Sequence, residues 1–515
     1  MVLVLKTSVG RPTASSNLAL SAMKRRRFCI VFFLWRIKNP FLLRATLIMH
    51  MKRFFTLLRE LPAHFSLKLC LTFGLVYVLF FVRSVLFLDP DFGWHLEAGN
   101  YFVHHGFPAT DVFTFTASDF PWVSHEWMHD VLVYAVHQTG GYAALAALFA
   151  LLWTAAFWIV GRNMHPALLF LAVLAVLPFS GIRTLTWSVL FLVVLIKTIS
   201  YKKGRFVPFL PLLFLVWANV HGSFVVGFAY LIFVAIQKKS IKLAAVAVAS
   251  VAVTFINPYG ARVYGEIIST LGDSSLHSRI FEWQSFYIQA ATMPYVIAWA
   301  AVTAFGFRKT WRQWRQYVRL DIVFFLASMS QNRHLPLFVM VSLPYTARGV
   351  ADIIALLPKT LDRPRKRFVR IMTAVFVLAT LVAGYVTFHH TTLDKENSFP
   401  VAAVEYLRAH PCQGNMFNSY DYGGYLIWKL PSQKVYIDGR MPSWEFNGQK
   451  YMDDYYRFQD DATFRYQQVK QYGISCALVD VRYDATIKAL QKQGWESVVR
   501  DESSVLLIKA KSEND

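Results

Sequence analysis

Apolar runs close to the length of a membrane span recur along the chain and predict its architecture. The runs lie at residues 67–88, 142–160, 166–180, 184–200, 206–220, 223–236, 241–257, 291–307, 320–332, 334–349 and 368–388. Between the first two, residues 126–137 predict a short helix at the membrane surface, ended by Gly140 and Gly141. We therefore expect a mainly α protein, a polytopic transmembrane helical bundle of about eleven spans.

The pattern changes near residue 396 to that of a small α/β domain. Helices are predicted at 401–410 and 451–472, the second stopped by Gly473. Strands are predicted at NMFNSY (415–420), KVYIDG (434–439), CALVDV (476–481) and SVLLIKA (504–510). The chain thus divides into a transmembrane domain (67–390), this α/β domain (396–515) and a basic N-terminal region (1–66). We expect the last to be partly disordered or the product of an upstream start codon.

Composition and charge predict the environment. The 515 residues are 55% hydrophobic, which excludes an ordinary soluble domain. The net charge is +22, but the basic residues form short clusters beside apolar runs, so nucleic-acid binding is not expected. Short cationic loops stay in the cytoplasm, which places these clusters on one face and the α/β domain on the other. We predict a multi-pass protein of a bacterial-type plasma membrane with its C-terminal domain outside the cytoplasm.

The loop between the first two spans, residues 88–130, is acidic. It holds seven carboxylates, and no Lys or Arg occurs between Arg83 and Arg162. Asp89 and Asp91 place two of these carboxylates at the membrane edge, where they can act as a general base or bind a divalent cation such as Mg²⁺ or Mn²⁺. The alternative is an acidic turn that caps a helix starting near Gly93.

Further ionisable groups are predicted on the same outer side. They are His95, Arg183, His221, Arg279, Glu282, Arg333 and His334. Such groups at span ends are costly unless they pair or carry function. Acids from one loop and arginines from several others suit a substrate that combines an acceptor to be deprotonated with a phosphate to be neutralised.

This arrangement resembles the C-type superfamily of integral-membrane glycosyltransferases (GT-C), and more narrowly a group of bacterial membrane proteins related to it. The segments that carry the resemblance are LDPDFGWH and its continuation (88–128), WANVHGSFVVG (217–227), INPYGARVYGEI (256–267), IFEWQSF (280–286), NRHLPLF (332–338) and the stretch from SYDYGG to IDGR (419–440). The resemblance implies a GT-C-like fold and the transfer, with inversion, of a sugar from a polyprenyl-phosphate-linked donor to a glycan, lipid or protein acceptor. We expect Asp91, or else Asp89, to be the base. Arg279, Arg333, Arg183 and His334 are expected to hold the phosphate.

A remoter resemblance is to the catalytic subunit of oligosaccharyltransferase. Residues 419–423, SYDYG, keep the D-Y-G of that family's acceptor-gripping W-W-D-Y-G motif but lack both tryptophans. Asp421 would then bond an acceptor hydroxyl, whereas the interpretation we prefer is an ordinary tight turn. The family's acidic pair in the second outer loop is missing, because SGIRTLTW (180–187) offers only Arg183, and metal dependence is left open. His95, His221 and Glu282 are accessory candidates, and a surface ion pair with Arg279 is the alternative for Glu282.

Two other functions compete with sugar transfer. Residues 125–129, HEWMH, fit the H-E-x-x-H motif of a zinc protease, in which His125 and His129 bind the metal from one helix face and Glu126 is the base. No third ligand is evident nearby. The second alternative is a non-catalytic membrane scaffold or polymer-handling protein of the same fold.

The four cysteines, at positions 29, 70, 412 and 476, show no metal-binding spacing. Cys412 and Cys476 belong to the predicted outer domain, where an oxidising compartment would allow them to pair. We expect free thiols, with this disulfide as the alternative.

Overall fold

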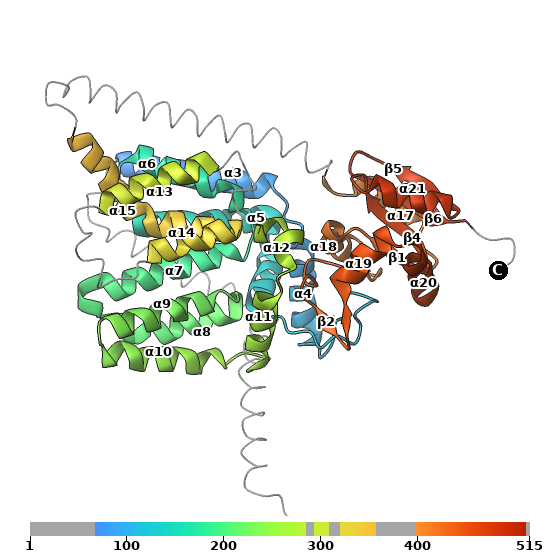
Figure 1. The fold of residues 1–515 in the computed structure, drawn as a ribbon, viewed down its shortest axis with the longest axis horizontal. Helices are drawn as coiled ribbons and strands as arrows, with labels where there is room; N and C mark the ends of the chain where they lie inside the picture. Colours follow the sequence, from blue (N-terminus) through green and yellow to red (C-terminus); the bar gives the residue numbers. More distant parts are fainter. Residues whose placement is uncertain (1–66, 285–292, 308–319, 357–397, 511–515) are drawn as a thin grey trace, which may run out of the picture. The chain divides into compact units, whose positions relative to one another are not determined.

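The computed structural model describes residues 67–284, 293–307, 320–356 and 398–510 (Figure 1). The predicted N-terminal region (1–66) and the predicted span at 368–388 lie outside these residues. Lys68–Asp515 belong to one compact unit, which is mainly helical and carries a small α/β region towards its C-terminal end.

Most helices of the helical part follow the predicted apolar runs, whereas those at 92–105, 262–272 and 276–279 lie outside them. Its helices are α3 (Leu67–Leu86), α4 (Phe92–His105), α5 (Trp127–Gly161), α6 (Pro166–Val176), α7 (Leu185–Ser200), α8 (Leu210–Val220), α9 (Phe224–Gln237), α10 (Ile241–Thr254), α11 (Arg262–Gly272), α12 (Leu276–Arg279), α13 (Met293–Phe307), α14 (Leu320–Ser330) and α15 (Leu335–Ala355). Among the described residues, Leu69–Leu86, Trp127–Gly161 and Asn332–Ala355 are long and apolar enough to cross a membrane. The other apolar helices are shorter, so the number of spans stays a prediction.

The predicted surface helix at 126–137 and the following run form one element, α5. The helix is interrupted at Gly141, whose φ of 64° and ψ of −164° are not helical. A positive φ is readily adopted only by glycine, so the break falls at one of the two glycines that the sequence singled out.

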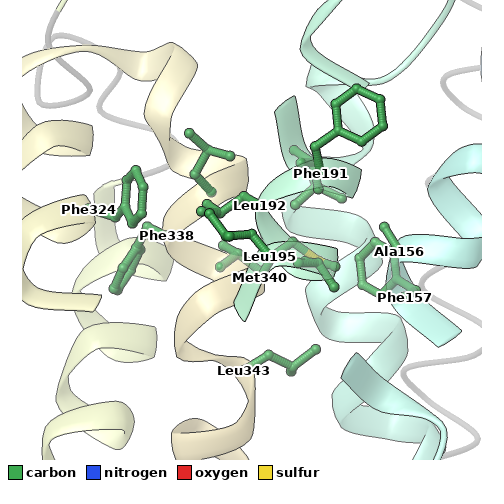
Figure 2. Close-up of a cluster of buried hydrophobic side chains, with 14 of the residues drawn as sticks. Ala156, Phe157, Phe191, Leu192, Leu195, Phe324, Phe338, Met340 and Leu343 are labelled. Atoms are coloured by element: carbon green, nitrogen blue, oxygen red, sulfur yellow. The ribbon is translucent and has the colours of Figure 1, made fainter. Parts of the chain in front are cut away.

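The core of the helical part is apolar and tightly packed. Figure 2 shows side chains of α5, α7, α14 and α15 meeting in one cluster: Ala156, Phe157, Phe191, Leu192, Leu195, Phe324, Phe338, Met340 and Leu343. Helices α13 and α15 are in close contact, because a methyl group added to Gly306 or Gly349 would overlap the backbone of the partner helix. The hydroxyls of Thr303 and Thr346 lie 2.7 Å apart across this contact. Small residues and polar side chains of this kind hold helices together inside membranes.

The C-terminal region contains a four-stranded sheet of order β1-β4-β6-β5, in which β1 and β4 are parallel and the other pairs antiparallel. Its elements are α17 (Val401–Ala409), β1 (Asn415–Asn418), α18 (Gly423–Lys429), β2 (Glu445–Phe446), β3 (Gln449–Lys450), α19 (Tyr451–Asp460), α20 (Ala462–Tyr472), β4 (Ile474–Asp480), α21 (Asp484–Lys492), β5 (Trp495–Arg500) and β6 (Ser504–Lys509). Three of the predicted strands are therefore confirmed as β1, β4 and β6.

Two predictions for this region are wrong. KVYIDG (434–439) is not a strand of the sheet, because Val435 pairs instead with the acidic loop (88–130), through an isolated parallel bridge to Thr114. The single helix predicted at 451–472 is two helices, α19 and α20. They are separated at Asp461, whose side chain accepts hydrogen bonds from the first backbone N–H groups of α20, as an N-cap does.

The expectation of free thiols at Cys412 and Cys476 is also wrong, because the structure joins them in a disulfide. Cys476 lies in β4 opposite Met416 of the parallel neighbour β1, and Cys412 lies just before β1. Strand pairing thus brings the two Cα atoms to 6.0 Å, although 64 residues separate them in sequence.

Glycines dock the C-terminal region onto the acidic loop. A methyl group on Gly93 in α4 would collide with the carbonyl of Gly424 in α18, and one on Gly424 with the carbonyl of Pro90. The rings of Phe92 and Trp428 pack edge to face beside this contact, with centroids 5.3 Å apart. The two backbones therefore touch at the segment that carries Asp89 and Asp91.

Candidate functional site

A cavity of about 660 Å³ lies between the acidic loop (88–130), the ends of several helices and the C-terminal region. All the site residues predicted from the sequence line it: Asp89, Asp91, His95, Arg183, His221, Arg279, Glu282, Arg333, His334 and Asp421. They come from segments up to about 330 residues apart, which only the tertiary fold brings together.

Asp89 and Glu282 share one cation. The Arg183 guanidinium donates through Nε to the Asp89 carboxylate and through Nη1 to the Glu282 carboxylate. The Asp89 side chain is only 7% exposed, so its negative charge is matched at close range. The alternative of a surface ion pair between Glu282 and Arg279 is wrong, because Arg279 pairs instead with Asp453 of α19.

Asp91 has a different environment. Its carboxylate accepts a hydrogen bond from the indole Nε1 of Trp94 at 3.0 Å and forms no ion pair with any described residue. The side chain makes no capping bond to α4, so the alternative of a helix-capping turn does not account for it. Burial, and next the nearby Asp89 charge, raise the pKa of Asp91 to about 7. A carboxylate with a pKa near neutrality is suited to exchange a proton at physiological pH.

The arginines around the cavity also divide into side chains with and without an ion pair. Arg279, Arg440 and Arg482 are paired with Asp453, with Asp111 and Asp438, and with Asp421 and Asp480, respectively. Arg333 lies with its guanidinium over the ring of Trp283, 4.0 Å from the centroid, and forms no ion pair within the described part of the chain. Arg333 is therefore the cavity arginine that has no ion pair with a carboxylate of the described residues.

Asp421 lies in a 3₁₀ turn directly before α18 rather than in an isolated turn. Residues Tyr420–Tyr422 form one 3₁₀ turn that continues directly into α18 at Gly423. The preferred interpretation of a tight turn is therefore incomplete. Gly424 serves the close helix contact described above, and a methyl group on Gly423 would overlap the backbone of Ile437 and Asp438. The Asp421 carboxylate is half exposed and accepts from Arg482 at 3.0 Å.

A second polar group surrounds Glu126. The Nε2 atoms of His221, His125 and His95 lie 3.4, 3.7 and 3.8 Å from its carboxylate. Burial raises the pKa of Glu126 and lowers the pKa of His95 to about 3 and that of His125 to about 4. Burial thus disfavours the charged form of each of these side chains.

The H-E-x-x-H interpretation is not supported. Helix α5 starts at Trp127, so His125 precedes the helix and cannot share a helix face with His129. The His129 Nδ1 atom accepts instead from the indole of Trp187 at 3.1 Å. Within residues 67–284, 293–307, 320–356 and 398–510, no group of three or more His, Cys, Asp or Glu side chains is placed to hold a metal ion.

The carboxylates at Asp89 and Asp91 also do not fit the divalent cation that the sequence suggested. A metal ion would need the Asp89 oxygens as ligands. Of those oxygens, Oδ2 accepts from the Arg183 guanidinium, which also donates to Glu282, and Oδ1 accepts the backbone N–H of Asp91 at 2.9 Å. The position between the acids is thus filled by a side chain of the protein itself.

Several residues that line the cavity were missed by sequence reasoning. They are Ser188, Glu266, Tyr420, Arg440 and Trp444. Burial raises the pKa of Glu266 to about 7, and Arg262 opposes this shift. Glu266 and Arg440 belong to segments that carry the GT-C resemblance, but no local pattern distinguishes them from structural residues there.

No protein-family model and no curated protein matches the sequence. Among solved structures, the chain is similar to the oligosaccharyltransferase AglB from Archaeoglobus fulgidus, crystallised with an inhibitory peptide and a dolichol-phosphate. The identity is 12%, the match covers 84% of this chain and 73% of that chain, and the TM-score is 0.55. It is also similar to ArnT from Cupriavidus metallidurans bound to undecaprenyl phosphate, with 12% identity, 86% and 98% coverage and a TM-score of 0.50.

The fold is GT-C-like. This is the fold that the resemblance in the sequence implied. At this level of identity the likeness establishes the fold alone. The chemistry of the cavity depends on this chain's own side chains.

Proposed function

We propose that the chain is an integral-membrane glycosyltransferase that moves a sugar from a polyprenyl-phosphate-linked donor to an acceptor on the outer face of the membrane. The observation that carries this proposal is the pairing pattern in one cavity. Asp91 is the aspartate of the D-P-D segment without an ion pair, and Arg333 is the cavity arginine without one, among the described residues. One side chain is thus available to take up a proton and the other to receive an anion.

The proposed step uses both. The Asp91 carboxylate takes the proton from an acceptor hydroxyl or amide, and the acceptor atom forms a bond to the anomeric carbon of the sugar. The bond between that carbon and the phosphate oxygen breaks, and its electron pair leaves on the phosphate. Arg333 stabilises the negative charge that develops there. Attack opposite the leaving phosphate inverts the anomeric carbon.

The two similar structures support the choice of donor. AglB was crystallised with a dolichol-phosphate and ArnT with undecaprenyl phosphate, which are both polyprenyl phosphates. An arginine stacked on an aromatic ring and without a carboxylate partner is well suited to a phosphate, because guanidinium groups bind phosphate oxygens in a bidentate manner.

A direct assay tests the proposal. The purified chain is placed in lipid nanodiscs with undecaprenyl-phosphate-linked sugars that carry a labelled sugar, together with cell-envelope acceptors. Transfer of the label to an acceptor is the expected result. A non-catalytic scaffold would instead bind the donor without consuming it under any combination of sugar and acceptor, and that outcome would reject the enzyme.

The transfer rate should depend on pH through Asp91. Its raised pKa of about 7 means that the carboxylate is protonated, and unable to accept a proton, at lower pH. The rate is therefore expected to rise about tenfold per pH unit below that value and to level off above it. Initial rates measured between about pH 5 and pH 9 check this. A rate that stays constant across neutral pH would contradict the role of Asp91.

Replacing Arg333 with Gln should weaken donor binding. Losing a charged donor to the phosphate costs about 1.5–3 kcal/mol, which corresponds to roughly a 10- to 100-fold higher KM for the polyprenyl-phosphate sugar. Arg348→Gln is the matched control, because Arg348 is exposed on the adjoining helix α15 and does not line the cavity. Equal donor KM values for the two variants would remove Arg333 from the phosphate site.

A further inference from the structure

We propose that the Arg183 guanidinium is a built-in cation that takes the place of a divalent metal ion between Asp89 and Glu282. As long as Arg183 is present, Asp89 and Glu282 therefore bind no divalent cation. The consequence that sugar transfer needs no added metal ion rests on the function proposed above, but the statement about metal binding does not.

The position of Arg183 supports this inference. It reaches Asp89, 94 residues earlier in the chain, and Glu282, 99 residues later, through different nitrogens of the same guanidinium. The guanidinium also lies near the ring of Phe87, 5.3 Å from its centroid. Its side chain is 19% exposed, so the group is enclosed and fixed from three sides. A planar guanidinium with several fixed N–H donors is suited to bridging two carboxylates, whereas the single ammonium of a lysine is not.

The charges around the cavity explain why a cation is needed there. Asp89, Asp91 and Glu282 all line it, and the negative charges of Asp89 and Glu282 are among the causes that raise the pKa of Asp91. Without a cation, the three acids would repel one another at low dielectric. Arg183 neutralises two of them and leaves Asp91 without an ion pair, which is the state that a proton acceptor requires.

Removing the guanidinium should expose a cation site. Asp89, which is buried, and Glu282, which is partly exposed, would then be two carboxylates without a cation. Carboxylate oxygens are the ligands that Mn²⁺ and Mg²⁺ prefer. The substitutions Arg183→Ala and Arg183→Gln both remove the charge, and the second keeps much of the side-chain volume.

Binding of Mn²⁺ tests the inference without any substrate. The full-length chain, washed with chelator and held in nanodiscs of uncharged lipid, is titrated with Mn²⁺ while the free ion is followed by electron paramagnetic resonance. The wild-type chain should leave the ion free. Arg183→Ala and Arg183→Gln should each bind one Mn²⁺ per chain, and adding Asp89→Asn and Glu282→Gln should abolish that binding. Arg162→Ala is the control, since it removes an exposed arginine outside the cavity and should bind none.

Two results would overturn the inference. One is that the wild-type chain binds Mn²⁺ and that the Asp89→Asn and Glu282→Gln substitutions abolish this binding. The ion would then bind at these acids although Arg183 is present. The other is failure of both Arg183 variants to bind Mn²⁺ although their gel-filtration profile and circular dichroism match the wild type. A chain that shows the expected Mn²⁺ behaviour but transfers no sugar would count against the proposed function alone.

Discussion

Replacing Asp91 with Asn is expected to lower the rate of sugar transfer by about 10²- to 10⁴-fold, which is the usual contribution of a general base. The amide keeps nearly the same shape but cannot take up the acceptor's proton. It still presents an oxygen to the Trp94 indole, which donates to Asp91 at 3.0 Å in the wild type. The fold should therefore survive, and transfer of a labelled sugar in nanodiscs, measured with saturating donor, checks the loss of rate.

Asp119→Asn is the matched control for that experiment. Asp119 lies in the same acidic loop, but it is exposed and does not line the cavity, so its rate should stay near that of the wild type. If Asp91→Asn retained the rate of the control while both proteins were inserted normally, Asp91 could not be the base. Asp89 would not be a ready substitute, because Arg183 already holds its charge.

Replacing Arg440 with Met is expected to destabilise the protein by about 3–5 kcal/mol, because it leaves buried charges without their partner. The Arg440 guanidinium donates to Asp111 of the first loop at 2.6 Å and to Asp438 at 2.8 and 2.6 Å. It also lies over the rings of Trp122 and Trp444. Asp111 and Asp438 have fully buried side chains, so water cannot compensate for the lost cation.

The midpoint of unfolding in nanodiscs measures this effect, with Lys450→Ala as the control. Lys450 pairs with Glu445 at 3.5 Å, but both side chains are about half exposed. A surface pair of this kind is worth about 0.2–1 kcal/mol. An Arg440→Met protein that unfolds at the same midpoint as the control would show that this link between the acidic loop and the C-terminal region does not stabilise the fold.

The two aspartates of the D-P-D segment illustrate how environment divides roles between like residues. They are two positions apart and chemically identical. Asp89 is enclosed beside a guanidinium, whereas Asp91 has only an indole N–H as its described side-chain partner. Nothing in the sequence around them distinguishes the two, and the preference for Asp91 as the base now has a structural reason.

The sequence by itself determined most of the local architecture. The apolar runs predicted most helices of the helical part, although not α4, α11 and α12. The alternation in the C-terminal region predicted β1, β4 and β6. It also supplied much of the chemical inventory of the candidate site, since all the residues proposed for sugar transfer line one cavity. The helices and strands follow from spacings of two to four residues, which set the faces of these elements. A short stretch of sequence is therefore enough to predict them.

Only the tertiary structure decided which charges pair. Arg183 with Asp89, Arg279 with Asp453 and Arg440 with Asp111 are separated by 94, 174 and 329 residues. The same holds for the disulfide and for Val435, whose strand-like segment pairs with the first loop instead of the sheet. Charge attraction and backbone pairing act on distance in space, and no local pattern encodes which distant segment will lie within reach once the helices have packed.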